Sequence, residues 1–203
     1  MKHGLLDLAE RIFVLGLYGA LVVRIVESIS ADGLGLGNLL LLPSEGLVFF
    51  FVLLRRRTRR VSARPGDWAL AMVATAAPML VRACPERALV PEFVAAFVVM
   101  MGTLVQLHAK LVLGRSFGCV PAHRGLKEAG PYRFVRHPMY AGYMLSHLAF
   151  LSMNASAWNC ALYLVCTLLQ IPRLVSEERL LGLDEGYTRY RARVRYRLIP
   201  GVY

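Results

Sequence analysis

Six apolar runs, separated by short polar or basic connections, constrain the fold of this chain more than any other feature. The runs cover residues 12–29, 36–54, 68–82, 91–113, 139–153 and 157–172. The longer runs approach the roughly 20 apolar residues that a helix needs to cross a bilayer. Hydrophobic residues make up 57% of the sequence, above the roughly half that is usual in soluble domains. We therefore predict an all-α, polytopic transmembrane helical bundle with about five to six spans.

The arginines between the apolar runs predict how the chain is oriented in the membrane. The connection 55–66 is rich in arginine, whereas the connection 30–37 contains neither lysine nor arginine. Because positively charged loops tend to stay in the cytoplasm, we place 55–66 on the cytoplasmic side. The first apolar run lacks a small-residue cleavage site and is expected to be a retained span. Counting spans then puts both termini and the connection 114–138 in the cytoplasm, and 152–159 outside.

The chain carries a formal net charge of +11, which in a soluble protein would suggest a nucleic-acid partner. Here, however, the basic residues lie in short connections between apolar runs. That distribution is typical of side chains that set membrane topology and contact anionic lipid headgroups. We therefore expect the lipid bilayer to be a partner of this chain, and we expect no nucleic acid.

The four cysteines, Cys84, Cys119, Cys160 and Cys166, contain no Cys-x-x-Cys pair and no regular spacing. Neither a metal site nor a disulfide framework is therefore expected. We predict that all four are buried small hydrophobic residues.

Two groups of polar residues lie within the apolar runs. Pro43 suits the first turn of a helix, which would leave Glu45 at an outer helix N-terminus where a negative charge is favoured. The second group is Gln106, His108 and Lys110. Because residues spaced by two splay around a helix, we interpret this group as the polar end of the fourth span. A functional role inside the membrane is the alternative for both groups.

The stretch GPYRFVRHPMYAGY, residues 130–143, combines a turn signal with a helix start. Gly130 and Pro131 favour a turn, and Pro138 can occupy the first turn of a helix that begins near residue 139. His137 and Tyr140 then flank a helix N-terminus, whose free N–H groups can bind a carboxylate or another anion. The same pattern also fits a plain helix start with aromatic side chains at the membrane interface.

A second polar cluster lies in LLQIPRLVSEERLLGL, where the last apolar run meets the cytoplasm. Arg173 and Glu177 are four residues apart and share a helix face, and Glu178 lies beside them. A solvated, salt-bridged helix end would have the same pattern. The two polar clusters, however, bracket one helical hairpin, 139–172, whose ends return to the same surface. We therefore predict that they form one pocket.

At the level of families, three ordered motifs resemble those of the integral-membrane isoprenylcysteine carboxyl methyltransferases. They lie in LGRSFGCVPAHRGLKEAGPYRFVRHPMYAGY, in PRLVSEERLL and in YTRYRARVRYRLIPGVY. The resemblance extends to the bacterial relatives of that family and to the broader phospholipid methyltransferase-like group. It divides the chain into a cofactor-binding and catalytic region, 110–203, and an N-terminal half, 1–109, of transmembrane helices that resembles no family.

The resemblance implies a membrane enzyme that binds S-adenosylmethionine in a cytoplasm-facing pocket, and the bacterial relatives suggest the inner membrane. By position, the cofactor would contact Arg124, Gly125, Leu126, Lys127, Tyr132, His137, Pro138, Met139, Tyr140 and Glu177. Arg173 matches the arginine that contacts the substrate, and no metal is implied. The spacer RLLGLDEG before Tyr187 is shorter than in the family, so the lid over the cofactor is expected to differ in shape.

The candidate catalytic residues are Arg173, Glu177 and Glu178. A carboxylate acceptor needs no general base, and Arg173 could hold it through a bidentate pair. An amine or thiol acceptor needs a base, for which Glu177 or Glu178 is the candidate. The acceptor is therefore predicted only as a lipophilic small molecule or a lipidated substrate, including an isoprenoid-linked or lipid-linked carboxylate. An NADPH-dependent reductase of the sterol-reductase type and a non-enzymatic membrane scaffold are the alternatives.

The C-terminal region combines an apolar stripe with a basic surface. Tyr187, Tyr190 and Val194 fall three and four residues apart, and five arginines lie between 189 and 197. We predict that 176–194 is a helix lying along the cytoplasmic interface, where it covers the cofactor.

Overall fold

The computed structural model of the chain describes residues 2–32, 36–55, 58, 61–82 and 84–203. It is 74% helical and has no strand among the described residues, which confirms the all-α prediction. The elements, in chain order, are α1 (Lys2–Asp32), α2 (Leu36–Leu53), α3 (Pro65–Ala76), η1 (Ala77–Leu80), η2 (Pro85–Arg87), α4 (Glu92–Leu113), η3 (Gly114–Ser116), η4 (Gly130–Arg133), α5 (Pro138–Met153), α6 (Ala157–Leu181) and α7 (Glu185–Arg193).

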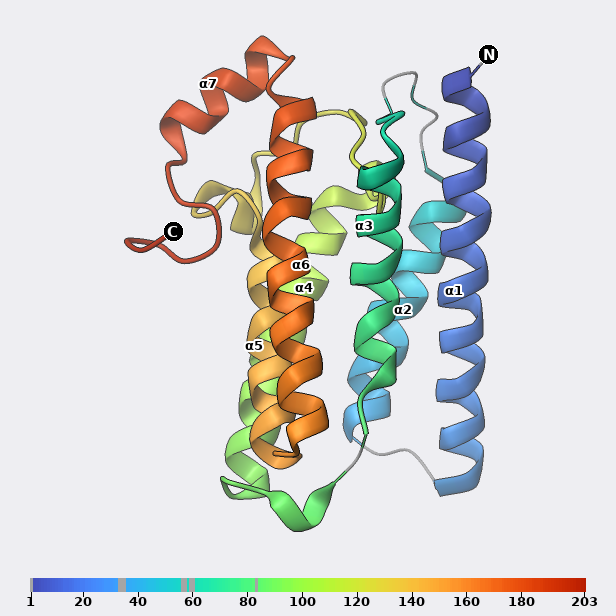
Figure 1. Cartoon of the computed structure of the whole chain (residues 1–203), viewed down its shortest axis with the longest axis vertical. Helices are drawn as coiled ribbons and strands as arrows, with labels where there is room; N and C mark the ends of the chain where they lie inside the picture. The colour runs from blue at the N-terminus through green and yellow to red at the C-terminus, as the bar shows by residue number, and fades with distance from the viewer. Residues whose placement is uncertain (1, 33–35, 56–57, 59–60, 83) are drawn as a thin grey trace.

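The long helices run along a common axis, so that successive helices return the chain from one end of the bundle to the other (Figure 1). The N-terminus of α1 and the short helix α7 lie at one end, whereas the turn between α5 and α6 lies at the other. This alternation agrees with the order of the apolar runs. Arg56, Arg57, Arg59 and Arg60, on which the predicted orientation depends, lie outside the described residues.

Among the described residues, two helical segments are long and apolar enough to cross a membrane. They are α4 with the turn that follows it, Glu92–Ser116, and α6, Ala157–Leu181. Helix α1 is 31 residues long but carries the buried acidic residues Asp7 and Glu10, and α3 has only 12 residues. The two apolar segments support membrane association. The number of spans, five to six, stays a prediction.

Helices α4 and α5 cross at two glycines, which lets their backbones touch. A Cβ atom on Gly142 would lie 2.8 Å from the Gly102 carbonyl oxygen, and one on Gly102 would lie 2.9 Å from the backbone nitrogen of Ser146. Small residues at such crossings are typical of helix packing in membranes. Beside the crossing, Gln106 Nε2 donates to Ser146 Oγ at 2.9 Å. This contact joins the middle of α4 to the middle of α5.

The predicted placement of Glu45 at a helix N-terminus is wrong. Helix α2 begins at Leu36 and continues through Pro43, so that Glu45 lies in its middle. The Glu45 carboxylate pairs with Lys110 Nζ of α4 at 2.8 Å, and the Lys110 side chain is fully buried. Gln106 and Lys110 share the buried face because they are four residues apart, whereas His108 is exposed. The interpretation as the polar end of a span agrees with Lys110, which lies in the last turn of α4, and both residues are buried within the bundle.

The predicted helix 176–194 is in fact two helices. Helix α6 continues through Pro172 to Leu181, and α7 begins at Glu185. The Asp184 side chain caps the new helix by accepting a hydrogen bond from the Tyr187 backbone N–H at 3.1 Å. The predicted apolar stripe is confirmed, because Tyr187, Tyr190 and Val194 are buried together; partly buried Leu126 and Leu181 pack against them.

The cysteines fall into two groups by burial. Cys119 and Cys166 are buried, as predicted, whereas Cys160 is exposed and Cys84 is partly exposed. The prediction that all four are buried is therefore wrong for Cys160 and Cys84. Cys160 lies on the exposed surface of α6, and Cys84 lies in the loop before η2.

Candidate functional site

A polar cavity of about 60 Å³ forms where the connection after α4 meets the start of α5 and the C-terminal part of α6, which is predicted to be cytoplasmic. Both polar clusters singled out in the sequence contribute to its walls. The predicted site residues that line it are Arg124, Tyr132, His137, Met139, Tyr140, Arg173 and Glu177. The structure therefore brings the two ends of the helical hairpin together, and the chemical roles of these residues stay predictions.

Tyr140 and Glu177 join the two helices across this cavity. Pro138, fully buried, opens α5 and places Tyr140 in its first turn. The Tyr140 hydroxyl donates to Glu177 Oε2 at 3.1 Å. One turn earlier on α6, the Arg173 guanidinium carbon lies 5.4 Å from the centre of the Tyr140 ring, within the range of a cation–π contact. A cation, an aromatic ring and a carboxylate thus follow one another along one wall.

Arg173 is buried, with 5% of its surface exposed. Its Nη2 donates to the Cys119 backbone oxygen at 3.1 Å, and no ion pair joins it to Glu177 within the part of the chain that the structure describes. Its Nε has no hydrogen-bond partner among the described residues. Because a buried donor without a partner lowers stability, this guanidinium is suited to a carboxylate or another anion that enters the cavity.

Glu178 faces a different set of partners. Its carboxylate pairs with Arg136 Nε at 2.7 Å and with Arg197 Nη2 at 3.0 Å, and His137 Nε2 lies 3.2 Å from its Oε1. The backbone N–H groups of Arg136 and His137 donate to the carbonyl groups of Tyr196 and Arg197. Glu178 therefore holds the C-terminal segment against the start of α5. Of the two candidate bases, only Glu177 lines the cavity.

Of the predicted cofactor loop at 124–127, one residue lines the polar cavity and three do not. Arg124 reaches the polar cavity, whereas Gly125, Leu126 and Lys127 do not line it. Gly125 has a φ of +97°, which favours glycine, and makes the turn that redirects the chain. Leu126 packs instead against the buried tyrosines of α7. Leu126 therefore supports the lid side of the site, and a cofactor contact from Gly125, Leu126 or Lys127 stays a prediction.

Sequence reasoning missed Glu10, a fully buried carboxylate of α1 that supports the cavity wall. Its Oε1 accepts hydrogen bonds from the backbone N–H groups of Cys119 at 2.7 Å and Val120 at 3.0 Å. Its other oxygen pairs with Arg55 Nη1 at 3.1 Å and with Arg124. The available signal was a pair of acidic residues three apart just before the first apolar run, Asp7 and Glu10, because that spacing puts both on one helix face.

The close approach of this cluster to the cavity wall requires a glycine at position 118. A Cβ atom there would clash with the Arg124 guanidinium and would lie 2.9 Å from Glu10 Oε1. The wall formed by Gly118, Cys119 and Val120 therefore rests directly on the buried charges, with its backbone N–H groups bound by Glu10 and one of its carbonyl groups bound by Arg173.

Helix α7 is hydrogen-bonded to Tyr132, which lines the polar cavity. The Tyr190 hydroxyl donates to the Tyr132 backbone oxygen at 2.8 Å. Burial raises the pKa of Tyr132 well above its ordinary value, so that its phenol stays neutral and able to donate. The lid and the wall of the cavity are thus joined by a direct hydrogen bond between residues 132 and 190.

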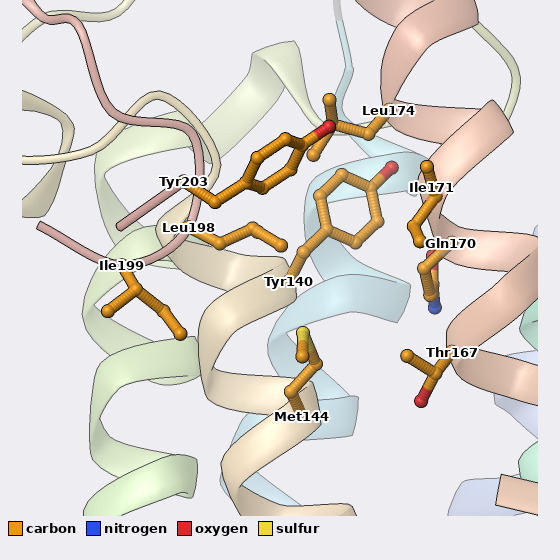
Figure 2. Close-up of a pocket in the computed structure, with 9 residues that line it drawn as sticks. All are labelled: Tyr140, Met144, Thr167, Gln170, Ile171, Leu174, Leu198, Ile199 and Tyr203. Carbon is orange, nitrogen blue, oxygen red and sulfur yellow. The ribbon is translucent and has the colours of Figure 1, made fainter. Parts of the chain in front are cut away.

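A second, apolar cavity of about 170 Å³, whose lining residues are drawn in Figure 2, shares Tyr140 with the polar one. Tyr140 and Met144 of α5 form one side, and four residues of α6 form the other (Figure 2). The residues contributed by α6 are Thr167, Gln170, Ile171 and Leu174, and those contributed by the C-terminal segment are Leu198, Ile199 and Tyr203. Tyr140 lines both cavities, so its side chain contacts a polar space and an apolar one.

Residues 90–187 match the phospholipid methyltransferase family. The matched segment contains every predicted site residue, from Arg124 to Glu178, while α1, α2 and α3 lie outside it. No curated protein matches the chain. The match confirms the resemblance to the broader phospholipid methyltransferase-like group, and with the two long apolar helices it points to a membrane methyltransferase.

Proposed function

We propose that this chain, whose residues 90–187 match the phospholipid methyltransferase family, is an integral-membrane methyltransferase that uses S-adenosylmethionine and acts on a lipophilic acceptor. The proposal is supported above all by the adjacency of a polar and an apolar cavity at Tyr140. A methyl transfer between a charged, water-soluble donor and a lipophilic acceptor needs two such spaces in contact, because the reacting atoms must approach to about 3–3.5 Å.

The residues of the polar cavity fit S-adenosylmethionine. The Glu177 carboxylate, which lines the cavity, suits its ammonium group. The ring of Tyr140, which already lies near one cation, provides an aromatic face for a positively charged group. When bound, S-adenosylmethionine supplies an electrophilic methyl group. The protein then has to hold and orient the acceptor and to exclude water.

The acceptor would enter from the apolar cavity, with its reactive end at Tyr140 and its apolar part between α5, α6 and the C-terminal segment. If that end is a carboxylate, Arg173 orients it and no proton has to be removed. If it is an amine or a thiol, Glu177 takes the proton, because Glu178 is occupied by Arg136 and Arg197. A carboxylate acceptor is favoured by the buried, partly unpaired guanidinium of Arg173.

In the membrane, we place the bundle with about five to six spans, both termini and the site in the cytoplasm, and α7 along the cytoplasmic interface. This arrangement is supported by the alternating ends of the helices and by the position of α7 at the same end as the start of α1 (Figure 1). The bacterial inner membrane is the proposed location, and the bilayer is the proposed partner.

The function is tested by equilibrium binding of radiolabelled S-adenosylmethionine and of NADPH to the full chain in lipid nanodiscs. We expect S-adenosylmethionine to bind and NADPH not to bind. Membranes containing the protein are then incubated with methyl-labelled cofactor, and the label is followed into lipid, protein and volatile products. NADPH binding without S-adenosylmethionine binding would instead indicate a reductase, and binding of neither would favour a scaffold.

A further inference from the structure

The C-terminal segment, residues 195–203, folds back against the ends of α5 and α6. The backbone N–H groups of Arg136 and His137, at the start of α5, donate to two of its carbonyl groups at 2.9 and 2.8 Å. On the side of α6, the Glu178 carboxylate lies 3.0 Å from Nη2 and 3.1 Å from Nε of Arg197. The segment therefore joins the two helices that form the apolar cavity.

Tyr203 is held within this segment by its backbone and by its side chain. Its backbone oxygen accepts hydrogen bonds from the N–H groups of Arg197, Leu198 and Ile199 at 2.9, 2.7 and 3.0 Å. Gly201, with a φ of +83°, makes the turn that brings Tyr203 back to them. Arg197 Nη1 donates to the Tyr203 hydroxyl at 2.9 Å, and the guanidinium carbon lies 5.1 Å from the centre of its ring. Arg197 therefore fixes the position of the ring.

The ring of Tyr203 is part of the wall of the apolar cavity. Tyr203 lines this cavity together with Leu198 and Ile199 of the same segment. Figure 2 shows its side chain reaching from the C-terminal segment towards Leu174 of α6, beside the ring of Tyr140. Tyr203 therefore bounds the space next to Tyr140, where we propose that the reactive end of the acceptor lies.

The size of this space limits what can fill it. The cavity has a volume of about 170 Å³, and an apolar cavity of about 150 Å³ binds one benzene. There is therefore room for about six to eight carbon atoms while the Tyr203 ring is in place. Ile171 and Ile199 also line the cavity and are 45% and 48% exposed. A longer chain can continue past them to the surface, whereas a rigid set of fused rings cannot bend to do so.

We infer that Tyr203 is a specificity-determining residue, whose ring limits the width of the acceptor next to its reacting group. The inference rests on the proposed function, because it takes the apolar cavity as the acceptor site. Arg197 is the positioning residue that holds the ring. An acceptor whose reacting group is attached to a linear acyl, alkyl or prenyl chain is accepted. A reacting group on a fused ring system, as in a sterol, is excluded because Tyr203 occupies the volume that the rings need.

The inference is tested with two photoreactive hydrocarbons on the full chain in nanodiscs. One is a linear alkane with a diazirine near its end, and the other is a steroid hydrocarbon with a diazirine and the same number of carbon atoms. Mass spectrometry measures the label on Met144 and Leu174, which line the cavity. That signal is divided by the label on the exposed Leu148 and Leu164, which corrects for unequal partition into the bilayer.

We expect the corrected labelling of the cavity by the linear probe to exceed that by the steroid about tenfold. This factor is the usual scale for forcing excess volume into a packed site. Equal corrected labelling by the two probes would overturn the inference.

Substitutions in the C-terminal segment assign the selection to one ring. Tyr203→Ala should raise corrected labelling by the steroid about tenfold, and continued labelling by the linear probe shows that its cavity is intact. Tyr203→Phe keeps the ring and should keep the exclusion of the steroid. Tyr196→Ala is the matched control, because Tyr196 is 39% exposed, against 40% for Tyr203, and does not line the cavity. Exclusion that survives in Tyr203→Ala, or that is lost in Tyr196→Ala, would overturn the assignment to Tyr203.

A double variant tests the positioning role of Arg197. Arg197→Gln removes the guanidinium that holds the Tyr203 ring, so it should also admit the steroid. Combining it with Tyr203→Ala should have no further effect on the labelling, because both substitutions act through the same ring. Additive effects of the two substitutions would overturn the positioning role, since they would show that Arg197 acts on the cavity by another route.

The labelling does not use the cofactor, so failure here can be told apart from failure of the proposed function. Equal labelling of the cavity by the two probes, together with normal binding of S-adenosylmethionine, would overturn the role of Tyr203 and leave the methyltransferase proposal standing. Labelling of Met144 and Leu174 by neither probe would overturn both the inference and the assignment of the cavity as the acceptor site.

Discussion

At the scale of single residues, Arg173 has two possible roles that the structure helps to separate. Its Nη2 supports the cavity wall through the Cys119 carbonyl group, while its Nε has no partner among the described residues. Because no described ion pair joins it to Glu177, a role in orienting that glutamate is not supported by direct contact. The remaining choice is between wall support and a clamp for an anionic acceptor.

We predict that Arg173→Lys slows methyl transfer by about tenfold or more, while cofactor affinity stays near that of the parent. A lysine ammonium can keep a single hydrogen bond to Cys119, but it cannot hold a carboxylate through two parallel bonds. The measurement is single-turnover methylation beside equilibrium binding of S-adenosylmethionine in the same variant. Equal losses in rate and affinity would make Arg173 a support of the wall and would remove this argument for a carboxylate acceptor.

The adjacent glutamates allow a matched pair of substitutions. We predict that Glu177→Gln weakens S-adenosylmethionine binding by roughly ten- to a hundredfold, because a charged hydrogen bond worth about 1.5–3 kcal/mol is lost. Glu178→Gln should instead lower the unfolding temperature, since Arg136 and Arg197 lose their ion-pair partner, and should change affinity less. Isothermal calorimetry and thermal unfolding measure the two effects. Unchanged affinity in folded Glu177→Gln would refute its role in the site.

At the scale of secondary-structure elements, α7 is the feature that couples the end of the chain to the site. It is short, it begins at the Asp184 cap, and it packs Tyr187 and Tyr190 against Leu126. Its contact with the polar cavity is the hydrogen bond from Tyr190 to the Tyr132 carbonyl group. Helix α7 is also attached through the ion pair of Arg193 with Glu128, and these attachments can be removed one at a time.

We predict that truncation after Leu181 abolishes cofactor binding but leaves the protein in the membrane, because α4 and α6 keep their apolar surfaces. Tyr190→Phe removes only the hydroxyl that donates to Tyr132, so it should weaken cofactor binding by a smaller factor, about fivefold. Membrane fractionation and equilibrium binding check both variants. Normal cofactor binding by the truncated protein would contradict the role of α7 as a lid.

The helix boundaries show where local sequence signals suffice and where they do not. The start of α5 was predicted to within a residue, because Pro138 suits the first turn of a helix, and the apolar run 91–113 begins within a residue of α4. The end of α6 was not, because Pro172 normally interrupts a helix and yet is accommodated here. The break at residues 182–184 depends on the Asp184 cap, which a continuous apolar periodicity through Tyr187 concealed.

At the scale of the whole molecule, the half of the chain without a family match is connected to the site through buried charges. Glu10 binds the wall at Cys119 and Val120, and it pairs with Arg55 and Arg124. Glu10 and Cys119 are more than a hundred positions apart in the sequence. No local sequence pattern could therefore have revealed their contact. The convergence of Tyr140 and Glu177, by contrast, was predictable because both lie at ends of the same hairpin.

We predict that Glu10→Gln destabilises the protein by about 3 kcal/mol, because it leaves Asp7 as the one described carboxylate that pairs with the buried guanidinium groups of Arg55 and Arg124. It should also weaken cofactor binding through movement of the cavity wall. Glu27→Gln, an exposed substitution on the same helix, is the control and should change neither property measurably. Chemical unfolding in detergent micelles and equilibrium cofactor binding provide the readouts. Parental stability of Glu10→Gln would contradict a supporting role for α1.

The orientation of the whole bundle gives a further prediction. If the arginine-rich connection after α2 lies in the cytoplasm, residue 203 and the start of α1 must lie there too. Single cysteines placed at position 203 and in the turn 154–156 of a cysteine-free chain should be labelled from opposite sides of sealed vesicles. Labelling of position 203 from the outer face would reverse the orientation and place the polar cavity away from cytosolic S-adenosylmethionine.

Tyr140, the side chain shared by the two cavities, has a thermodynamic consequence for a working enzyme. Any ligand that fixes its ring from the polar side also fixes the wall of the apolar side. Occupancy of one cavity therefore changes the free energy of filling the other, and linkage requires the effect to be equal in both directions. Cofactor and acceptor would in that case bind as a coupled pair, each altering the apparent dissociation constant of the other by the same factor.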